Sequence, residues 1–166
     1  MKIAIFSDSH DNINNLKKAI LWLKENKIKK IIHCGDICSP DVLKEALLGF
    51  DFEVDLCFGN ADYDKNYWKK SFEKNPKIKI HRDLGELVFN NKKIGFCHFN
   101  DQAKKLAKEG KYDIFFYGHT HKPWEEMIGK CRLVNPGNLS GILYKATFAV
   151  YDTSDEKLEL KILERI

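Results

Sequence analysis

Near its start the chain reads Ile3-Ala4-Ile5-Phe6-Ser7-Asp8-Ser9-His10, a short apolar run that stops abruptly at a polar cluster. The apolar part is β-branched or aromatic and continuous rather than alternating, which is typical of a strand buried on both faces. The polar part begins where this strand would end, and it contains an aspartate and a histidine, both common metal ligands. The pattern predicts a buried strand with polar side chains at its carboxyl end.

Four further apolar runs end in the same way. The runs are Ile31–Ile32, Val54–Phe58, Ile94–Cys97 and Ile114–Tyr117. The polar clusters that follow them are Cys34-Gly35-Asp36, Gly59-Asn60-Ala61-Asp62, Cys97-His98 and Gly118-His119-Thr120-His121. Between the runs, helical spacing of apolar residues and capping residues predict helices over Asn14–Asn26, Pro40–Leu48 and Asp101–Glu109.

The alternation of strands and helices predicts an α/β fold with a mainly parallel sheet and helices outside it. From Leu84 onward the pattern changes to strands joined by short turns, which predicts a second, more antiparallel sheet packed on the first. These strands are Leu84–Phe89 and Lys92–Cys97 around the turn Asn90-Asn91, then Glu125–Ile128, Cys131–Val134, Ala146–Asp152 and Leu158–Leu163. Because no repeat or flexible linker marks a boundary, residues 1–166 are expected to form a single domain.

Composition narrows the class of protein. With 43% hydrophobic and 31% charged residues, the chain is expected to be soluble and globular. No apolar run is long enough to cross a membrane, and no signal pattern is visible. The five cysteines form no CxxC pair and are expected to be free thiols, which favours the cytoplasm. The net charge of +4 comes from scattered lysines, so no long nucleic acid is expected as a partner, and self-association stays open.

The polar clusters are expected to meet in one site. In open α/β sheets, ligands bind outside the carboxyl ends of the strands. Four of the six histidines stand at these ends, while His33 is expected in the core and His81 at the surface. Seven side chains with oxygen or nitrogen donors are too many for one ion, so we expect two divalent ions at one site. These residues are Asp8, His10, Asp36, Asn60, His98, His119 and His121.

Taken in order, the motifs resemble those of the calcineurin-like metallophosphoesterase superfamily. They are Asp8-x-His10, Gly35-Asp36, Gly59-Asn60-x-Asp62, His98 and Gly118-His119-x-His121. The likeness extends to about residue 138. The short length of the chain resembles that of the small bacterial and archaeal phosphodiesterases, whose nearest eukaryotic relative is a scaffold subunit of the retromer coat. It implies a four-layer α-β-β-α sandwich, in which two mixed sheets are flanked by helices.

The resemblance also implies a role for each motif residue. One metal ion would be held by Asp8, His10, Asp36 and His121, and a second, bridged by Asp36, would be completed by Asn60, His98 and His119. Asp36, Asn60 and His98 would take part in catalysis, and Asp62 and Asn135 would support the site. A metal-bound hydroxide would attack the phosphorus of a small phosphoester in line. Manganese or nickel is favoured, with zinc, iron and cobalt as alternatives.

One position departs from the family pattern. Many members carry a histidine between the asparagine and the acid of the third motif, where it can protonate the leaving oxygen, and this chain has Ala61 there. A methyl group donates no proton, so the sequence predicts a preference for acidic leaving groups and for diesters over alkyl monoesters.

Two rival functions remain at this stage. A protein-binding scaffold on the same fold could carry a vestigial metal site, although a scaffold has no need to keep all seven donors. A nuclease would require a basic track near the motifs, and no cluster of lysines and arginines stands there. The leading prediction is a metal-dependent phosphodiesterase.

Overall fold

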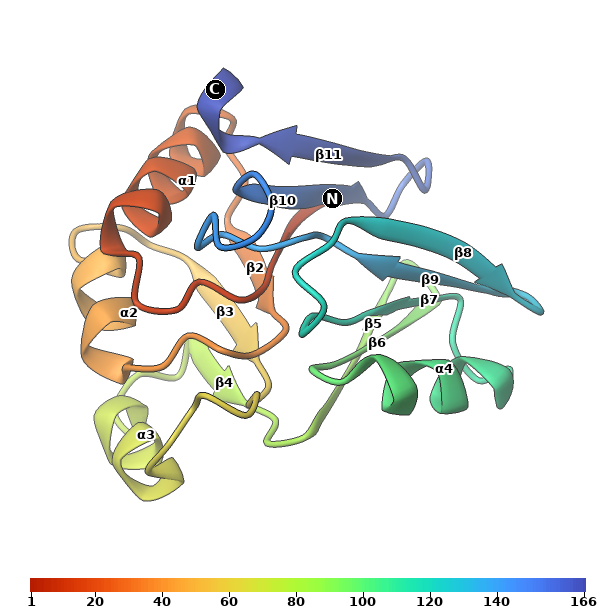
Figure 1. The fold of residues 1–166 in the computed structure, drawn as a ribbon, viewed down its shortest axis with the longest axis horizontal. Helices are drawn as coiled ribbons and strands as arrows, with labels where there is room; N and C mark the ends of the chain where they lie inside the picture. Colours follow the sequence, from red (N-terminus) through yellow and green to blue (C-terminus); the bar gives the residue numbers. More distant parts are fainter.

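The computed structural model describes residues 1–166 and contains two β-sheets that pack face to face (Figure 1). The first sheet has six strands in the order β11-β10-β1-β2-β3-β4 and the second has five in the order β5-β6-β7-β9-β8. The first is built from β1 Lys2–Phe6, β2 Lys30–His33, β3 Glu53–Leu56, β4 Ile78–Ile80, β10 Thr147–Asp152 and β11 Leu158–Ile162. The second is built from β5 Leu84–Phe89, β6 Lys92–Cys97, β7 Ile114–Phe116, β8 Trp124–Ile128 and β9 Cys131–Asn135.

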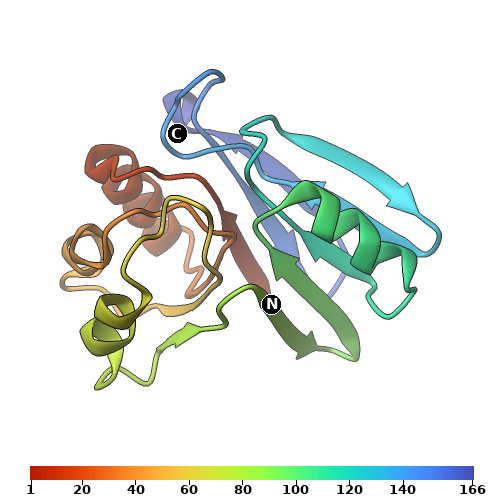
Figure 2. The same ribbon diagram turned by 60° about the horizontal axis from the view of Figure 1, so that its bottom comes forward.

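Helices form the two outer layers. In Figure 2 the helices of the first part of the chain, coloured red to yellow, lie on the outer side of the first sheet, and the green helix lies on the outer side of the second. The red to yellow helices are α1 Ile13–Glu25, α2 Pro40–Leu47 and α3 Lys65–Phe72, the green one is α4 Asn100–Lys108, and a short 3-10 turn, Leu163–Arg165, follows β11. The predicted four-layer α-β-β-α sandwich is therefore confirmed. No helix is both long and apolar enough to cross a bilayer.

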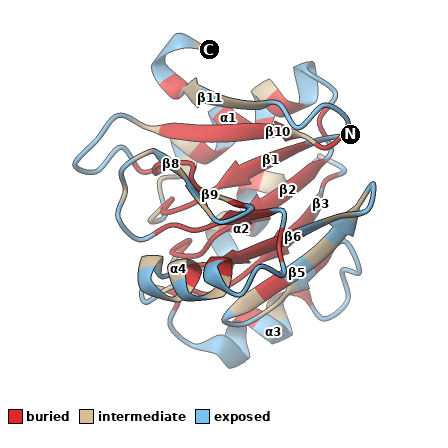
Figure 3. Ribbon diagram, turned by 90° about the vertical axis from the view of Figure 1, so that its right-hand side faces the viewer, coloured by how far each residue is buried: buried red, intermediate tan, exposed pale blue.

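Three apolar clusters fill the spaces between the four layers, and the strands at their centre are the most buried parts of the ribbon (Figure 3). Strand β1 illustrates why. Ala4 and Phe6 face the helices, while Ile3 and Ile5 face the second sheet. Because successive side chains of a strand point to opposite faces, only a continuous apolar run suits a sheet covered on both sides.

Strand direction places the carboxyl ends together. Strands β1 to β4 pair in parallel, and so do β6, β7 and β9. The loops that follow β1, β2 and β3 therefore leave one edge of the first sheet, and those that follow β6 and β7 leave one edge of the second.

One part of the predicted topology is wrong. Strands β10 and β11 belong to the first sheet, where β10 pairs antiparallel with β1, and not to the second. The second sheet is mixed, with antiparallel pairs at both edges and parallel pairs between them. Strand β4 and helix α3 were not predicted at all. Helix α3 buries only Trp68 and Phe72, too few apolar residues for a clear helical period.

His81, expected at the surface, is only partly exposed. Its Nε2 lies 2.5 Å from Oδ1 of Asp55, a fully buried carboxylate that also pairs with the largely buried Lys30. Although burial opposes it, the contacts with His81 and Lys30 lower the pKa of Asp55. The histidine ring packs edge-on against Phe96 of the facing sheet. A single histidine with lysines around it in the sequence gives no sign of such a buried ion pair.

Candidate metal centre

The candidate site lies where the carboxyl ends of the two sheets meet. Asp8 and His10 follow β1, Asp36 follows β2, Asn60 follows β3, His98 follows β6, and His119 and His121 follow β7. The Asp8 N–H donates to the Gly35 carbonyl at 3.0 Å, which joins two loops of the first sheet. The His119 N–H donates to the Asp8 carboxylate and so links the second sheet to the first.

Two buried carboxylates form the centre of the site. Asp8 Oδ1 lies 3.4 Å from Nε2 of His121 and 3.9 Å from Nε2 of His10. Asp36 Oδ2 lies 3.3 Å from Nε2 of His98 and 3.7 Å from Nε2 of His10. The donor atoms of Asp8, His10 and His121 all lie within 4.8 Å of one another, and so do those of Asp8, Asp36 and His98. These five side chains form two adjoining groups that share Asp8.

The two exposed members of the predicted set border the open side of the site. Asn60 Oδ1 lies 3.1 Å from Nε2 of His98, and the ring of His119 lies 5.1 Å from the ring of His98 between centroids. His98 is itself buried and uses its Nδ1 at 2.8 Å from the Cys34 carbonyl. Because the Cys34 carbonyl can only accept, Nδ1 donates to it, and Nε2 faces Asp36 and Asn60 across the site.

The charges in the site call for a cation. Every ion-pair partner of Asp8 and Asp36 is a histidine, and no lysine or arginine reaches either carboxylate. Although burial opposes it, the hydrogen bond with His98 lowers the pKa of Asp36, so this carboxyl is ionised at neutral pH. Buried negative charges without a counter-charge are costly. Carboxylate, amide and imidazole donors suit borderline divalent metals, and the residues present therefore fit such ions.

The loops hold these side chains in an unusual backbone conformation. Five of the seven residues have φ in the left-handed region, where non-glycine residues are uncommon. They are Asp8 at 50°, His10 at 42°, Asp36 at 57°, His119 at 68° and His121 at 59°. Conformations of this kind cost roughly 1–3 kcal/mol each and gather at functional sites. No spacing of residues in the sequence indicates them.

Asp62 organises the loop that carries Asp36. Its carboxylate accepts four backbone N–H groups at 2.7–2.9 Å, three from consecutive residues beginning at Asp36 and one from Gly59. Burial nevertheless raises the pKa of Asp62. The side chain touches none of the donor atoms of the site, so it acts by fixing the loops after β2 and β3 against each other.

Asn135 supports the loop after β7. Its Nδ2 donates to the Gly118 carbonyl at 2.8 Å and to Thr120 Oγ1 at 3.0 Å. Asn138, which the sequence did not single out, donates to the His121 carbonyl at 3.0 Å. Both belong to the turn at residues 135–138, and a pair of asparagines in one turn is the only sequence signal for this role.

Cys38 is the thiol that lies against a predicted ligand. Its Sγ is 3.6 Å from Nδ1 of His10. Burial raises the pKa of Cys38 to about 12, which disfavours its thiolate form. All five cysteines are free and four are buried, which agrees with their expected role as small apolar residues.

His33 is a core residue, as predicted, and it lies directly beneath the site. Its Nε2 is 3.2 Å from Oγ of Ser9, between Asp8 and His10, and its Nδ1 has no hydrogen-bond partner. Burial lowers the pKa of His33 from its ordinary 6.5 to about 3. The folded protein therefore keeps this imidazole neutral, whereas the unfolded chain takes up a proton near pH 6.5.

Acid should destabilise the protein through His33. Because the folded-state pKa is the lower one, stability is lost as the pH falls from about 6.5 towards 3, by up to about 1.4 kcal/mol per pH unit. Between pH 7 and pH 5 the wild type should lose about 2 kcal/mol more free energy of unfolding than His33→Gln. Urea unfolding of both proteins at the two pH values measures this difference. Equal losses would mean that His33 titrates normally in the folded state.

Comparison with known proteins identifies the family. Residues 1–156 match the model of the calcineurin-like phosphoesterase superfamily domain. A phosphodiesterase of Methanocaldococcus jannaschii is 30% identical over 167 residues, which cover 99% of this chain and 100% of that protein.

Solved structures give the same result. A structure described as a novel archaeal phosphodiesterase superposes with a TM-score of 0.89 at 29% identity, covering 98% of this chain and 99% of that one. Zinc-bound Vps29 of Entamoeba histolytica, at 18% identity and a TM-score of 0.72, covers 98% and 99% and shares the fold. The predicted class, a hydrolase of phosphoric esters, is confirmed at the level of the family. The chain belongs to the calcineurin-like phosphoesterase superfamily.

Proposed function

We propose that this chain is a phosphodiesterase that works with two divalent metal ions. The observation that supports this most strongly is the meeting of two buried carboxylates and three histidines from four different loops, with no lysine or arginine paired to either carboxylate. A site of this composition is suited to phosphoryl transfer, in which stabilisation of negative charge is the main catalytic task.

We assign the ligands as the family resemblance implies. Asp8, His10, Asp36 and His121 would hold one ion, and Asn60, His98 and His119 would complete the other. Asp36 is suited to bridge because its Oδ2 faces both His10 and His98. Mixed oxygen and nitrogen donors favour manganese or nickel, with zinc, iron and cobalt as alternatives. When bound, such ions supply an activated water and offset the charge that builds on the phosphate oxygens.

The chain's own residues would orient the substrate. The Ala61 N–H donates to Asp36 Oδ1 at 2.7 Å and fixes the rotation of this carboxylate. Asn60 turns its Oδ1 towards His98, which leaves its Nδ2 free to donate to a phosphate oxygen at the exposed side of the site. Asp36, Asn60 and His98 are accordingly the residues that we propose for catalysis.

A metal-dependence assay tests the proposal. The protein is stripped with chelator, manganese or nickel is added back, and bis(p-nitrophenyl) phosphate is compared with p-nitrophenyl phosphate. We expect hydrolysis only in the metal-loaded protein and faster hydrolysis of the diester. Metal binding without turnover of either ester would favour the rival function, a protein-binding scaffold on the same fold.

Replacing Ala61 by histidine should restore a proton donor for the leaving group. We expect kcat/KM for diesters with alkyl leaving groups to rise by up to about 10²-fold, because general acid catalysis contributes most when the leaving oxygen is strongly basic. Diesters that release p-nitrophenolate should change little. Ala61→Gln is the control, since its amide fills similar space without supplying an acid. An unchanged rate for the alkyl esters in Ala61→His would exclude a missing general acid as the basis of selectivity.

We also propose a cell compartment and a substrate size for this chain. Five free cysteines favour a reducing cytoplasm. Because no cluster of lysines and arginines stands near the site motifs in the sequence, we propose a small phosphodiester rather than a long nucleic acid as the substrate.

A further inference from the structure

Phe99 is an exposed aromatic residue beside the candidate metal centre. Its ring lies 5.0 Å from the ring of His98 and 5.1 Å from that of His119, with interplanar angles of 78° and 64°. The residue is nevertheless 41% exposed. The two imidazoles thus hold the ring in place at the open side of the site, and part of its surface remains available for another contact.

The position that Phe99 occupies normally favours a different residue type. Phe99 is the N-cap of α4, and it makes no capping hydrogen bond. The other three helices have capping side chains at this position, namely Asn12, Ser39 and Asp64. A polar N-cap is worth about 1 kcal/mol of stability. Phe99 contributes no capping hydrogen bond to the stability of α4, and it exposes an aromatic ring beside the candidate metal centre. Such a residue indicates a functional role rather than a role in stabilising the fold.

We propose that Phe99 determines substrate specificity by packing against a planar aromatic group of the phosphodiester. This inference rests on the proposed function and narrows it to diesters that carry an aryl group or a nucleobase. Ring-to-ring contacts prefer edge-to-face or offset arrangements and every nucleobase has such a face, so the contact selects for aromaticity rather than for one base. The group that packs here is the one retained on phosphorus, and the metal centre acts on the other ester bond.

A series of three diesters with one leaving group tests the proposal. The p-nitrophenyl diesters of phenyl, thymidine 5′ and methyl phosphate release the same product and differ only in the retained group. In the wild type, kcat/KM should be higher for the two aromatic diesters, by roughly threefold to tenfold relative to methyl. The preference should appear as a lower KM for the aromatic diesters, with similar kcat values, and it should disappear in Phe99→Leu and Phe99→Asn.

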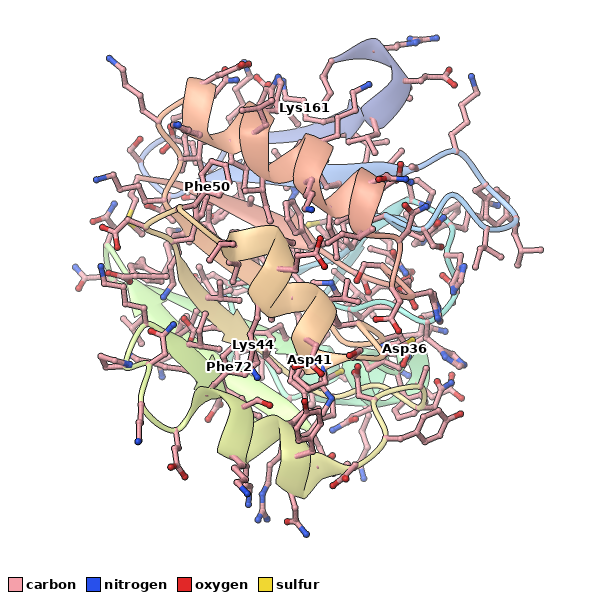
Figure 4. All side chains as sticks on the ribbon, turned by 90° about the vertical axis from the view of Figure 1, so that its left-hand side faces the viewer. Asp36, Asp41, Lys44, Phe50, Phe72 and Lys161 are labelled. Atoms are coloured by element: carbon pink, nitrogen blue, oxygen red, sulfur yellow. The ribbon has the colours of Figure 1, made fainter.

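The variants are chosen to separate recognition from folding. Asparagine is a preferred N-cap, so Phe99→Asn should keep α4 intact and melt at or above the wild-type temperature. Tyr67 is the matched control, because it is 42% exposed and bonds to Asp41 between α3 and α2. Lys44 of α2 bonds to Asp41 and lies over the ring of Phe72 of α3, so this control position belongs to the α2–α3 contact (Figure 4). Tyr67→Leu should retain the aromatic preference.

A binding measurement distinguishes failure of this inference from failure of the proposed function. Phenylphosphonate and methylphosphonate, neither of which is a diester substrate, are titrated calorimetrically into the manganese-loaded wild type and Phe99→Asn. Tighter binding of phenylphosphonate only in the wild type supports the role of Phe99 even without turnover. Turnover of all three diesters with the same preference in wild type and variants would overturn it while leaving the proposed function standing. A preference for phenyl but not thymidine would assign the contact to simple aryl esters.

Discussion

Asp36→Asn should lose phosphodiesterase activity by at least about 10³-fold together with its bound metal. Asparagine has nearly the same shape, and its Oδ1 can still accept the Ala61 N–H that fixes the native carboxylate at 2.7 Å. What the substitution removes is the negative charge that faces both His10 and His98. The two buried carboxylates are the only negatively charged side chains in the proposed ligand set. The substitution would therefore remove half of the negative charge that balances the two cations.

Metal content and turnover must be measured together in this variant. Metal per chain is determined by atomic emission after dialysis against manganese, and kcat is measured with bis(p-nitrophenyl) phosphate. Asp41→Asn is the control, since Asp41 is an exposed aspartate that contacts Lys44 and Tyr67. It should keep both metal and activity. Turnover like that of the wild type in Asp36→Asn would remove the two-metal proposal, whatever its metal content.

The position of this aspartate could be predicted because strand ends are local in sequence. A buried strand followed by Gly35-Asp36 places the acid at the sheet edge regardless of the rest of the fold, and the same holds for His98 after β6. The structure brings these ends together, as the parallel pairing of β1 to β3 and of β6 with β7 requires. Local pattern and strand direction were sufficient for this part of the prediction.

What could not be predicted depends on contacts between distant parts of the chain. Strand β10 pairs with β1, about 145 residues away, and nothing in its own sequence distinguishes this sheet from the other. The ion pair between the partly exposed His81 and the buried Asp55 could not be predicted either, because the partners are 26 residues apart and each is an ordinary polar residue. The left-handed backbone conformation of the proposed metal-binding residues depends on how the loops after the strands pack against one another, and this packing also joins distant parts of the chain.

The glycines of the motifs show how tightly those loops pack. Gly35 has φ of +92°, and a Cβ built on it would lie 2.7 Å from the Gly59 nitrogen and 2.8 Å from Nδ1 of His98. Both distances are shorter than real Cβ contacts, so a side chain here must push apart the loops after β2, β3 and β6. The same motion would displace His98, whose Nδ1 lies 2.8 Å from the Cys34 carbonyl.

Gly35→Ala should therefore lower both stability and activity, and Gly49→Ala separates the two causes. Gly49 has a similar φ of +80° but has no atom within 4 Å of the added methyl group, so it reports the backbone cost alone, about 1–2 kcal/mol. Gly35→Ala should cost about 1–3 kcal/mol more, because its methyl group overpacks the loops. Its kcat/KM should fall about 10²-fold, since a displacement of about 1 Å is enough to misalign reacting groups. Urea unfolding and diester hydrolysis of the two variants measure both effects. Equal losses in the two variants would mean that Gly35 is required for its backbone angle and not for the close approach that builds the site.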